Sequence, residues 1–134
     1  MTRVPDVPLW IWWIPVVLAI SIPWSGFVPR PQWDRVHPMP FTDPADRPRD
    51  FLANVALFIP FGWSYGRRGP VWKAVAIAAA VSVTAEATQL FSNTRFPSAT
   101  DITAALAGAA VGALGSTLLT RMSSRAQEKA SPAK

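Results

Sequence analysis

Cysteine is absent from the 134 residues of this chain, and histidine occurs once, as His37. Without cysteine the chain can form no disulfide, no thiolate nucleophile and no cysteine-based metal site. A single histidine argues against a zinc site and against a histidine-based acid and base pair. We therefore expect no metal and no cofactor, and carboxylates are the acids and bases that remain.

Charged side chains are also missing from long stretches. Apolar blocks at about 9–28, 50–66, 70–91 and 101–119 alternate with segments rich in proline and arginine. The first block is uncharged, and a helix of that length is about 30 Å long, which matches the hydrocarbon core of a bilayer. We predict an all-α fold, an integral membrane bundle of four transmembrane helices, in a single domain over residues 1–134.

The first block has a competing interpretation as a signal peptide. Its N-terminal flank carries only Arg3 as a positive charge, offset by Asp6, and no small-x-small cleavage site follows. Tryptophans lie near both ends of the block, as in the aromatic belts of membrane spans. These features favour a retained anchor.

The net charge is +5, which in a soluble protein suggests nucleic acid. Here the basic residues are scattered between apolar blocks, so we expect no nucleic acid partner. Four spans would place eight lysines and arginines with the two termini and the 66–70 turn, and five on the other side. The positive-inside rule then predicts a multi-pass protein of the inner membrane, with both termini and a basic tail (120–134) in the cytoplasm.

The segment 29–49 is rich in proline, which predicts an extended, partly ordered loop rather than a helix. Its acids and bases nearly balance, so we expect no charged-ligand patch from it.

Glu86 is the only acid between Val71 and Phe91. An ionisable side chain at membrane depth costs about 2.5–3.5 kcal/mol and usually faces the bundle interior or a water-filled cavity. Four-span topology brings the costly polar residues to the outer end of three helices and one loop. We predict a shallow, outward-facing pocket lined by Asp50, Asn54, Glu86, Gln89, Arg95, Ser98 and Asp101.

Two members of this set carry further expectations. Arg95 is the obvious counter-charge for Glu86 or Asp101, because a lone buried charge is costly. Asn54 shares a helix face with Asp50, and it could either bridge two helices by hydrogen bonds or contact a ligand.

Small residues mark the expected helix contacts. Ala104, Gly108, Gly112 and Ser116 recur every four positions, which favours close approach of helix backbones. Ser82 continues a stripe of alanines on the third helix. Gly62 follows Pro60, where the second helix is expected to bend.

These residues resemble the VanZ-like family of small bacterial membrane proteins. Asn54, Phe58, Pro60 and Gly62 are similar to its N-x-x-x-F-x-P-x-G helix; Ser82, Glu86 and Gln89 to its S-x-x-x-E-x-x-Q helix; and Arg95, Ser98, Asp101, Gly108 and Gly112 to its loop and last helix. The resemblance covers about residues 50–116. Ala105 departs from it, since the family often has an asparagine nearby, which puts a polar contact from the fourth helix in doubt.

The resemblance implies an integral membrane protein of four or so helices. Its founding member is associated with resistance to teicoplanin, a glycopeptide that acts at the outer face of the membrane. Our leading hypothesis is a protein of the cell envelope that binds a ligand in this pocket, and the sequence leaves open whether it is also an enzyme. Membrane lipids, and either a glycopeptide or a lipid-linked cell-wall precursor, are its expected partners.

Two other function classes stay open. One is a membrane enzyme acting on a lipid-linked phosphate, with Glu86 and Asp101 as acid and base and Arg95 holding the phosphate. The other is a small transporter subunit assembled through Gly108 and Gly112. The sequence leaves the oligomeric state open.

Overall fold

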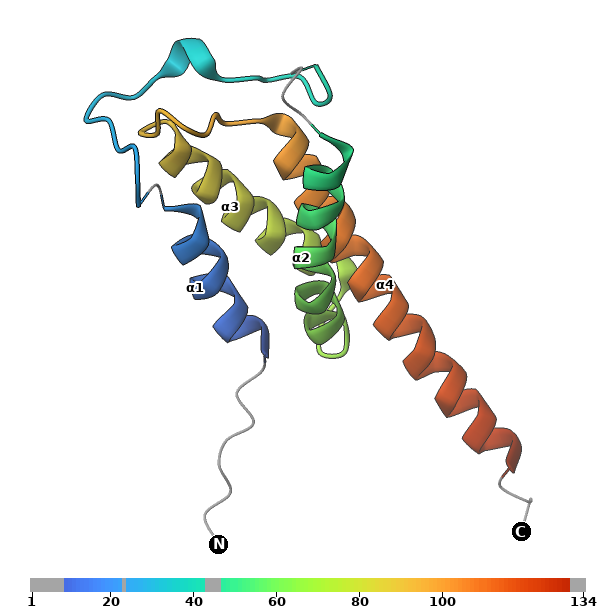
Figure 1. The fold of residues 1–134 in the computed structure, drawn as a ribbon. Helices are drawn as coiled ribbons and strands as arrows, with labels where there is room; N and C mark the ends of the chain where they lie inside the picture. Colours follow the sequence, from blue (N-terminus) through green and yellow to red (C-terminus); the bar gives the residue numbers. More distant parts are fainter. Residues whose placement is uncertain (1–8, 23, 43–46, 131–134) are drawn as a thin grey trace, which may run out of the picture.

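The computed structural model describes residues 9–22, 24–42 and 47–130. Its helices are α1 (Leu9–Ser21), α2 (Pro48–Gly66), α3 (Val71–Gln89) and α4 (Ala99–Ala130), with a short 3-10 helix, η1 (Trp33–Arg35). Figure 1 shows α2, α3 and α4 together, with α1 beside them and a long connection passing over one end. The described residues form isolated β-bridges but no named strand, so the all-α prediction is confirmed.

The predicted end of the first helix at residue 28 is wrong, because α1 ends at Ser21. Proline at position 23 disfavours helical backbone at the residue before it and has no N–H to continue the ladder. The Ser21 hydroxyl donates to the Val17 carbonyl at 2.7 Å, in the last turn. The 13 residues of α1 reach only about 20 Å, less than a bilayer core.

The fourth helix is longer than predicted. A basic tail was expected from residue 120, but α4 continues to Ala130. No glycine or proline interrupts residues 117–130, and alanine, arginine, glutamine, glutamate and lysine there all favour helix. The last part of the predicted tail, residues 131–134, lies outside the described residues.

The helices α2 and α4 approach so closely that glycine is needed at the contact. A Cβ atom built on Gly62 would overlap the Ala109 carbonyl, and one on Gly112 would overlap the Ile59 carbonyl. Gly108 has the same relation to Val55. The neighbours in each case are backbone atoms, which have no rotamer to change. A continuous row of alanines on α4 packs into the same core: Ala105, Ala109 and Ala113.

Two of the four helices, α3 and α4, are long and apolar enough to cross a membrane. Only 28% and 39% of these apolar stretches are buried inside the protein. The exposed remainder includes Val83, Val111, Leu114 and Leu118. A water-soluble core helix would instead bury most of its apolar surface. The four-span prediction is thus supported for two helices, since α1 is short and α2 begins with charged residues.

The residues 24–42, here called the strap, cross over the loop 90–98 that joins α3 to α4 (Figure 1). Backbone hydrogen bonds hold the two segments together. The pairs are Val28 with Phe91, Gln32 with Leu90, and His37 with both Pro97 and Ala99. The strap and the α3–α4 loop therefore form one hydrogen-bonded layer over that end of the bundle, which we call the strap end.

A substitution at Gly26 tests whether the strap docks on the α3–α4 loop. Its φ is +79°, and a Cβ there would overlap the side-chain amide of Asn93. Gly26→Ala is therefore expected to destabilise strap docking by about 1–3 kcal/mol, seen as faster proteolysis of residues 24–42. Combining it with Asn93→Ala removes the overlap but not the backbone strain, so we expect partial recovery. Wild-type proteolysis rates in Gly26→Ala would contradict the described docking.

Candidate functional site

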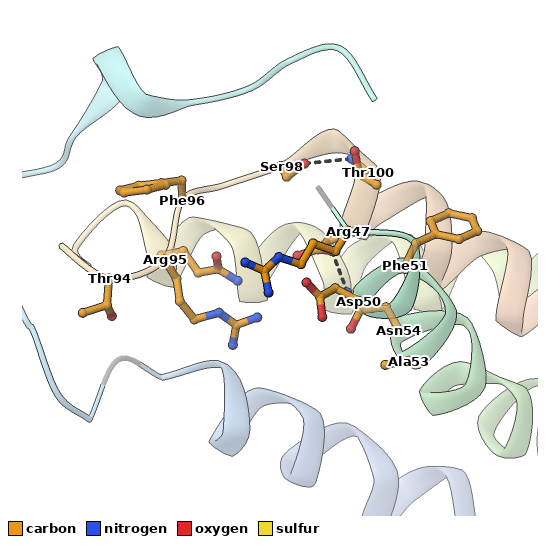
Figure 2. A pocket seen from close by; sticks show the side chains of 12 residues that line it. Arg47, Asp50, Phe51, Ala53, Asn54, Thr94, Arg95, Phe96, Ser98 and Thr100 are labelled. Atoms are coloured by element: carbon orange, nitrogen blue, oxygen red, sulfur yellow. Dashed lines mark hydrogen bonds between the residues drawn. The ribbon is translucent and has the colours of Figure 1, made fainter. Parts of the chain in front are cut away.

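A polar cavity of about 510 Å³ opens at the strap end of the bundle. Figure 2 shows its lining side chains, which come from the start of α2, the end of α3, the α3–α4 loop and the start of α4. The lining residues are Arg47, Asp50, Phe51, Ala53, Asn54, Gln89, Thr94, Arg95, Phe96, Ser98, Thr100 and Asp101. We call this space the polar cavity.

A smaller space of about 180 Å³ adjoins it, which we call the inner chamber. The two spaces share Asn54, Gln89, Arg95 and Asp101 as lining residues. The chamber is also lined by the polar side chains of Ser82 and Glu86. Its apolar lining includes Val17, Ile20, Leu57 and Phe58. All seven residues proposed from the sequence for the pocket therefore line one space or the other.

Glu86 is 7% exposed, and its carboxylate is held by hydrogen bonds. The backbone N–H of Ser98 donates to Oε2 at 2.8 Å, and Gln89 Nε2 donates to Oε1 at 3.4 Å. Because Ser98 immediately precedes α4, this contact ties α3 to the beginning of α4. The spacing that places Glu86 and Gln89 on one face thus produces a clamp between elements.

Asp101 and Asn54 make the corresponding link between α4 and α2. Asn54 Nδ2 donates to Asp101 Oδ1 at 2.6 Å. Asn54 also lines both spaces, so its side chain bridges two helices and borders the cavity at once. Ser98 caps α4, because its hydroxyl accepts the N–H of Thr100 at 3.2 Å.

Arg95 does not serve as the predicted counter-charge of Glu86 or Asp101. It is exposed, and it forms no salt bridge with Glu86 or Asp101 among the described contacts. The buried acid is satisfied by the N–H and amide donors named above, so it needs no counter-charge from Arg95. Buried Ser92 sets the backbone there, since its hydroxyl accepts the N–H groups of Thr94 and Arg95.

Arg47 was missed by sequence reasoning. The near balance of charge in 29–49 suggested no ligand patch in that segment, yet its Arg47 lines the polar cavity. Arg47 immediately precedes α2, and the fold places this end of α2 opposite the α3–α4 loop. Ser92 was missed too, although a serine two residues before a threonine in a loop is a pattern that favours a side-chain turn.

Further contacts connect the strap to the α3–α4 loop, which lines the polar cavity. The Arg35 guanidinium lies over the Phe96 ring, 3.7 Å from its centroid, and Arg35 also donates to Gln32 Oε1 at 2.6 Å. Gln32 Nε2 in turn donates to the Ser92 carbonyl at 3.1 Å. The strap thereby supports the loop that carries Arg95.

The described residues contain no group of three or more histidines and acids arranged to hold a metal ion. Ala105, named above as a departure from the resemblance, is fully buried in the apolar core. The fourth helix therefore makes no polar contact at that position. The polar residues that α4 contributes to the cavity lining are Thr100 and Asp101, at its start.

Comparison with curated proteins found no significant match, and neither did comparison with solved structures. The sequence model of the VanZ/LLP1 family matches residues 9–120. That match includes α1, α2, α3, the part of α4 up to residue 120, and every residue of the polar cavity and the inner chamber. The chain therefore belongs to the VanZ/LLP1 family.

Proposed function

We propose that this protein is a multi-pass protein of the bacterial inner membrane that binds an amphiphile in the polar cavity, facing outward. Two apolar, largely exposed helices and membership of the family support the membrane location. In this arrangement α1 and α2 pack against α3 and α4 within the bilayer, and both termini lie in the cytoplasm. The basic residues of α4 beyond residue 120 suit the cytoplasmic side.

One observation carries the binding proposal: a polar cavity adjoins a chamber whose lining includes several apolar side chains. A ligand that fits both spaces has a polar head and an apolar part. A lipid-linked cell-wall precursor has this character, and so do lipids of the membrane itself. Through such a ligand the protein would influence susceptibility to teicoplanin, which acts at the same face.

No specific observation favours either of the two alternative functions. In the enzyme hypothesis Glu86 is an acid or base, but its two oxygens accept hydrogen bonds that hold the α3–α4 loop. In the transporter hypothesis α4 assembles copies through Gly108 and Gly112, but both glycines already contact α2 of the same chain.

Reporter fusions test the topology. We expect fusions at positions 40 and 96 to report the outer side, and fusions at positions 68 and 130 to report the cytoplasm. A cytoplasmic signal at position 96 would contradict an outward-facing cavity, whatever the ligand.

Titration with teicoplanin tests the cavity. Expression of the wild-type protein in a sensitive host is expected to shift the inhibitory concentration, and Asp101→Asn is expected to remove most of that shift. The variant keeps an oxygen that can accept from Asn54 and removes the negative charge. Asp34→Asn, in η1 and away from both spaces, is the matched control. Equal shifts for all three proteins would contradict a role of the cavity.

A further inference from the structure

The polar cavity holds two arginines from different elements. Arg47 comes from the residue before α2, and Arg95 comes from the α3–α4 loop. Figure 2 shows both guanidinium groups directed into the cavity. Neither forms a salt bridge or a side-chain hydrogen bond with a described residue. Two cations that share one cavity repel each other, and a bound anion between them would relieve this repulsion.

The acids that line the cavity do not take that place. Asp101 accepts the short hydrogen bond from Asn54, at 2.6 Å. Asp50 also lines the cavity, and its Oδ1 pairs with Arg49 Nε at 3.4 Å. Each carboxylate therefore has a partner other than the two arginines, whose donors are left for a ligand.

The chain also builds a support for each arginine. Two hydrogen bonds to buried Ser92 fix the loop backbone before and at Arg95, and the strap bonds to the Ser92 carbonyl. Arg47 is held at the N-terminus of α2, where the helix dipole also favours negative charge. A planar guanidinium matches the oxygens of phosphate in a bidentate geometry.

We propose that the polar cavity binds the phosphate or diphosphate headgroup of a lipid between Arg47 and Arg95. The apolar part of the lipid then starts in the inner chamber, beside Val17, Ile20, Leu57 and Phe58. The oxygens of one phosphate group can accept hydrogen bonds from both guanidinium groups. The apolar side chains of the chamber favour a lipid over a free anion. This inference rests on the proposed amphiphile binding and adds the charge and chemistry of the head.

The test uses the full chain purified in detergent and three probes: farnesyl diphosphate, farnesol and inorganic pyrophosphate. We expect farnesyl diphosphate to bind at least about tenfold more tightly than either of the others, by titration calorimetry. Arg47→Gln and Arg95→Gln should each weaken that binding by about tenfold, because each removes a charge-assisted contact of roughly 1.5 kcal/mol or more.

Arg30→Gln is the matched control. Arg30 is an exposed arginine of the strap, at the same end of the bundle, and lies outside the lining of both spaces. Its binding should stay within about twofold of wild type, a shift of less than about 0.5 kcal/mol. Thermal unfolding and monodispersity of each variant show that the comparison is made on folded protein.

The outcomes separate this inference from the function on which it rests. Equal binding of farnesol and farnesyl diphosphate, unchanged in the arginine variants, would overturn the headgroup site and leave amphiphile binding intact. Pyrophosphate binding as tightly as farnesyl diphosphate, with loss in the arginine variants, would retain the anion site and overturn the lipid. Binding of none of the three probes would overturn both.

Discussion

Gly112→Ala is expected to destabilise the bundle by about 1–3 kcal/mol or more, as overpacking does in well-packed cores. The added methyl group would overlap the Ile59 carbonyl and lie against the Trp63 amide. These are backbone atoms, so the two helices must separate for the methyl group to fit. The measurement is the thermal unfolding midpoint of the purified protein in detergent, with Gly62→Ala as the same test from the other helix.

Gly115→Ala is the control for this prediction. A Cβ at position 115 would meet only the side-chain ring of Trp63, at 3.3 Å, and that ring can shift. Alanine also favours helix over glycine by about 0.5–1 kcal/mol, so the variant should be neutral or slightly more stable. Equal midpoints for Gly112→Ala and Gly115→Ala would show that α2 and α4 do not pack through the glycines as described.

Glu86→Ala is expected to loosen the whole strap end. It removes the acceptor of the Ser98 N–H and of the Gln89 amide, and an unsatisfied buried donor costs about 1–3 kcal/mol. The clamp between α3 and the start of α4 is then lost. Hydrogen exchange should accelerate across residues 90–101, with a lower unfolding midpoint.

Glu86→Gln separates the clamp from the charge. Its amide oxygen can still accept the Ser98 N–H, so exchange in residues 90–101 should remain close to wild type. Thr84→Ala, an exposed position on the same helix, serves as the control for substitution on α3. If Glu86→Ala left exchange at 90–101 unchanged, the clamp would not hold the loop, and Glu86 would be free to serve as a ligand contact.

The residues that line the site could be predicted because few positions in a membrane bundle keep polar side chains away from lipid. Glu86 stands in an apolar stretch and shares a face with Ser82 and Gln89, so its direction followed from helix geometry. The same reasoning placed Asn54 and Asp101 near it, at the starts of their helices. The structure brings these residues to adjoining spaces, and whether they bind a ligand remains the proposal made above.

The partners of those residues could not be predicted. Arg95 was assigned to a buried acid because charges were matched by type, whereas the acid is satisfied by an N–H group of the chain itself. Every residue except proline has a backbone N–H group, so the sequence does not show which of them donates to a given side chain. Arg47 was overlooked for a related reason, since the average charge of its segment hides the direction of one side chain.

The sequence by itself determined the helical class, the stripes of small residues along which helices pack closely, and the polar residues that must gather away from lipid. Tertiary structure alone decided that the strap covers the α3–α4 loop, that Glu86 holds Ser98, and that Arg47 and Arg95 share one cavity. The reason is physical. Helix periodicity and side-chain hydration depend on near neighbours in the chain, whereas those contacts join residues far apart in sequence and form only when the helices pack.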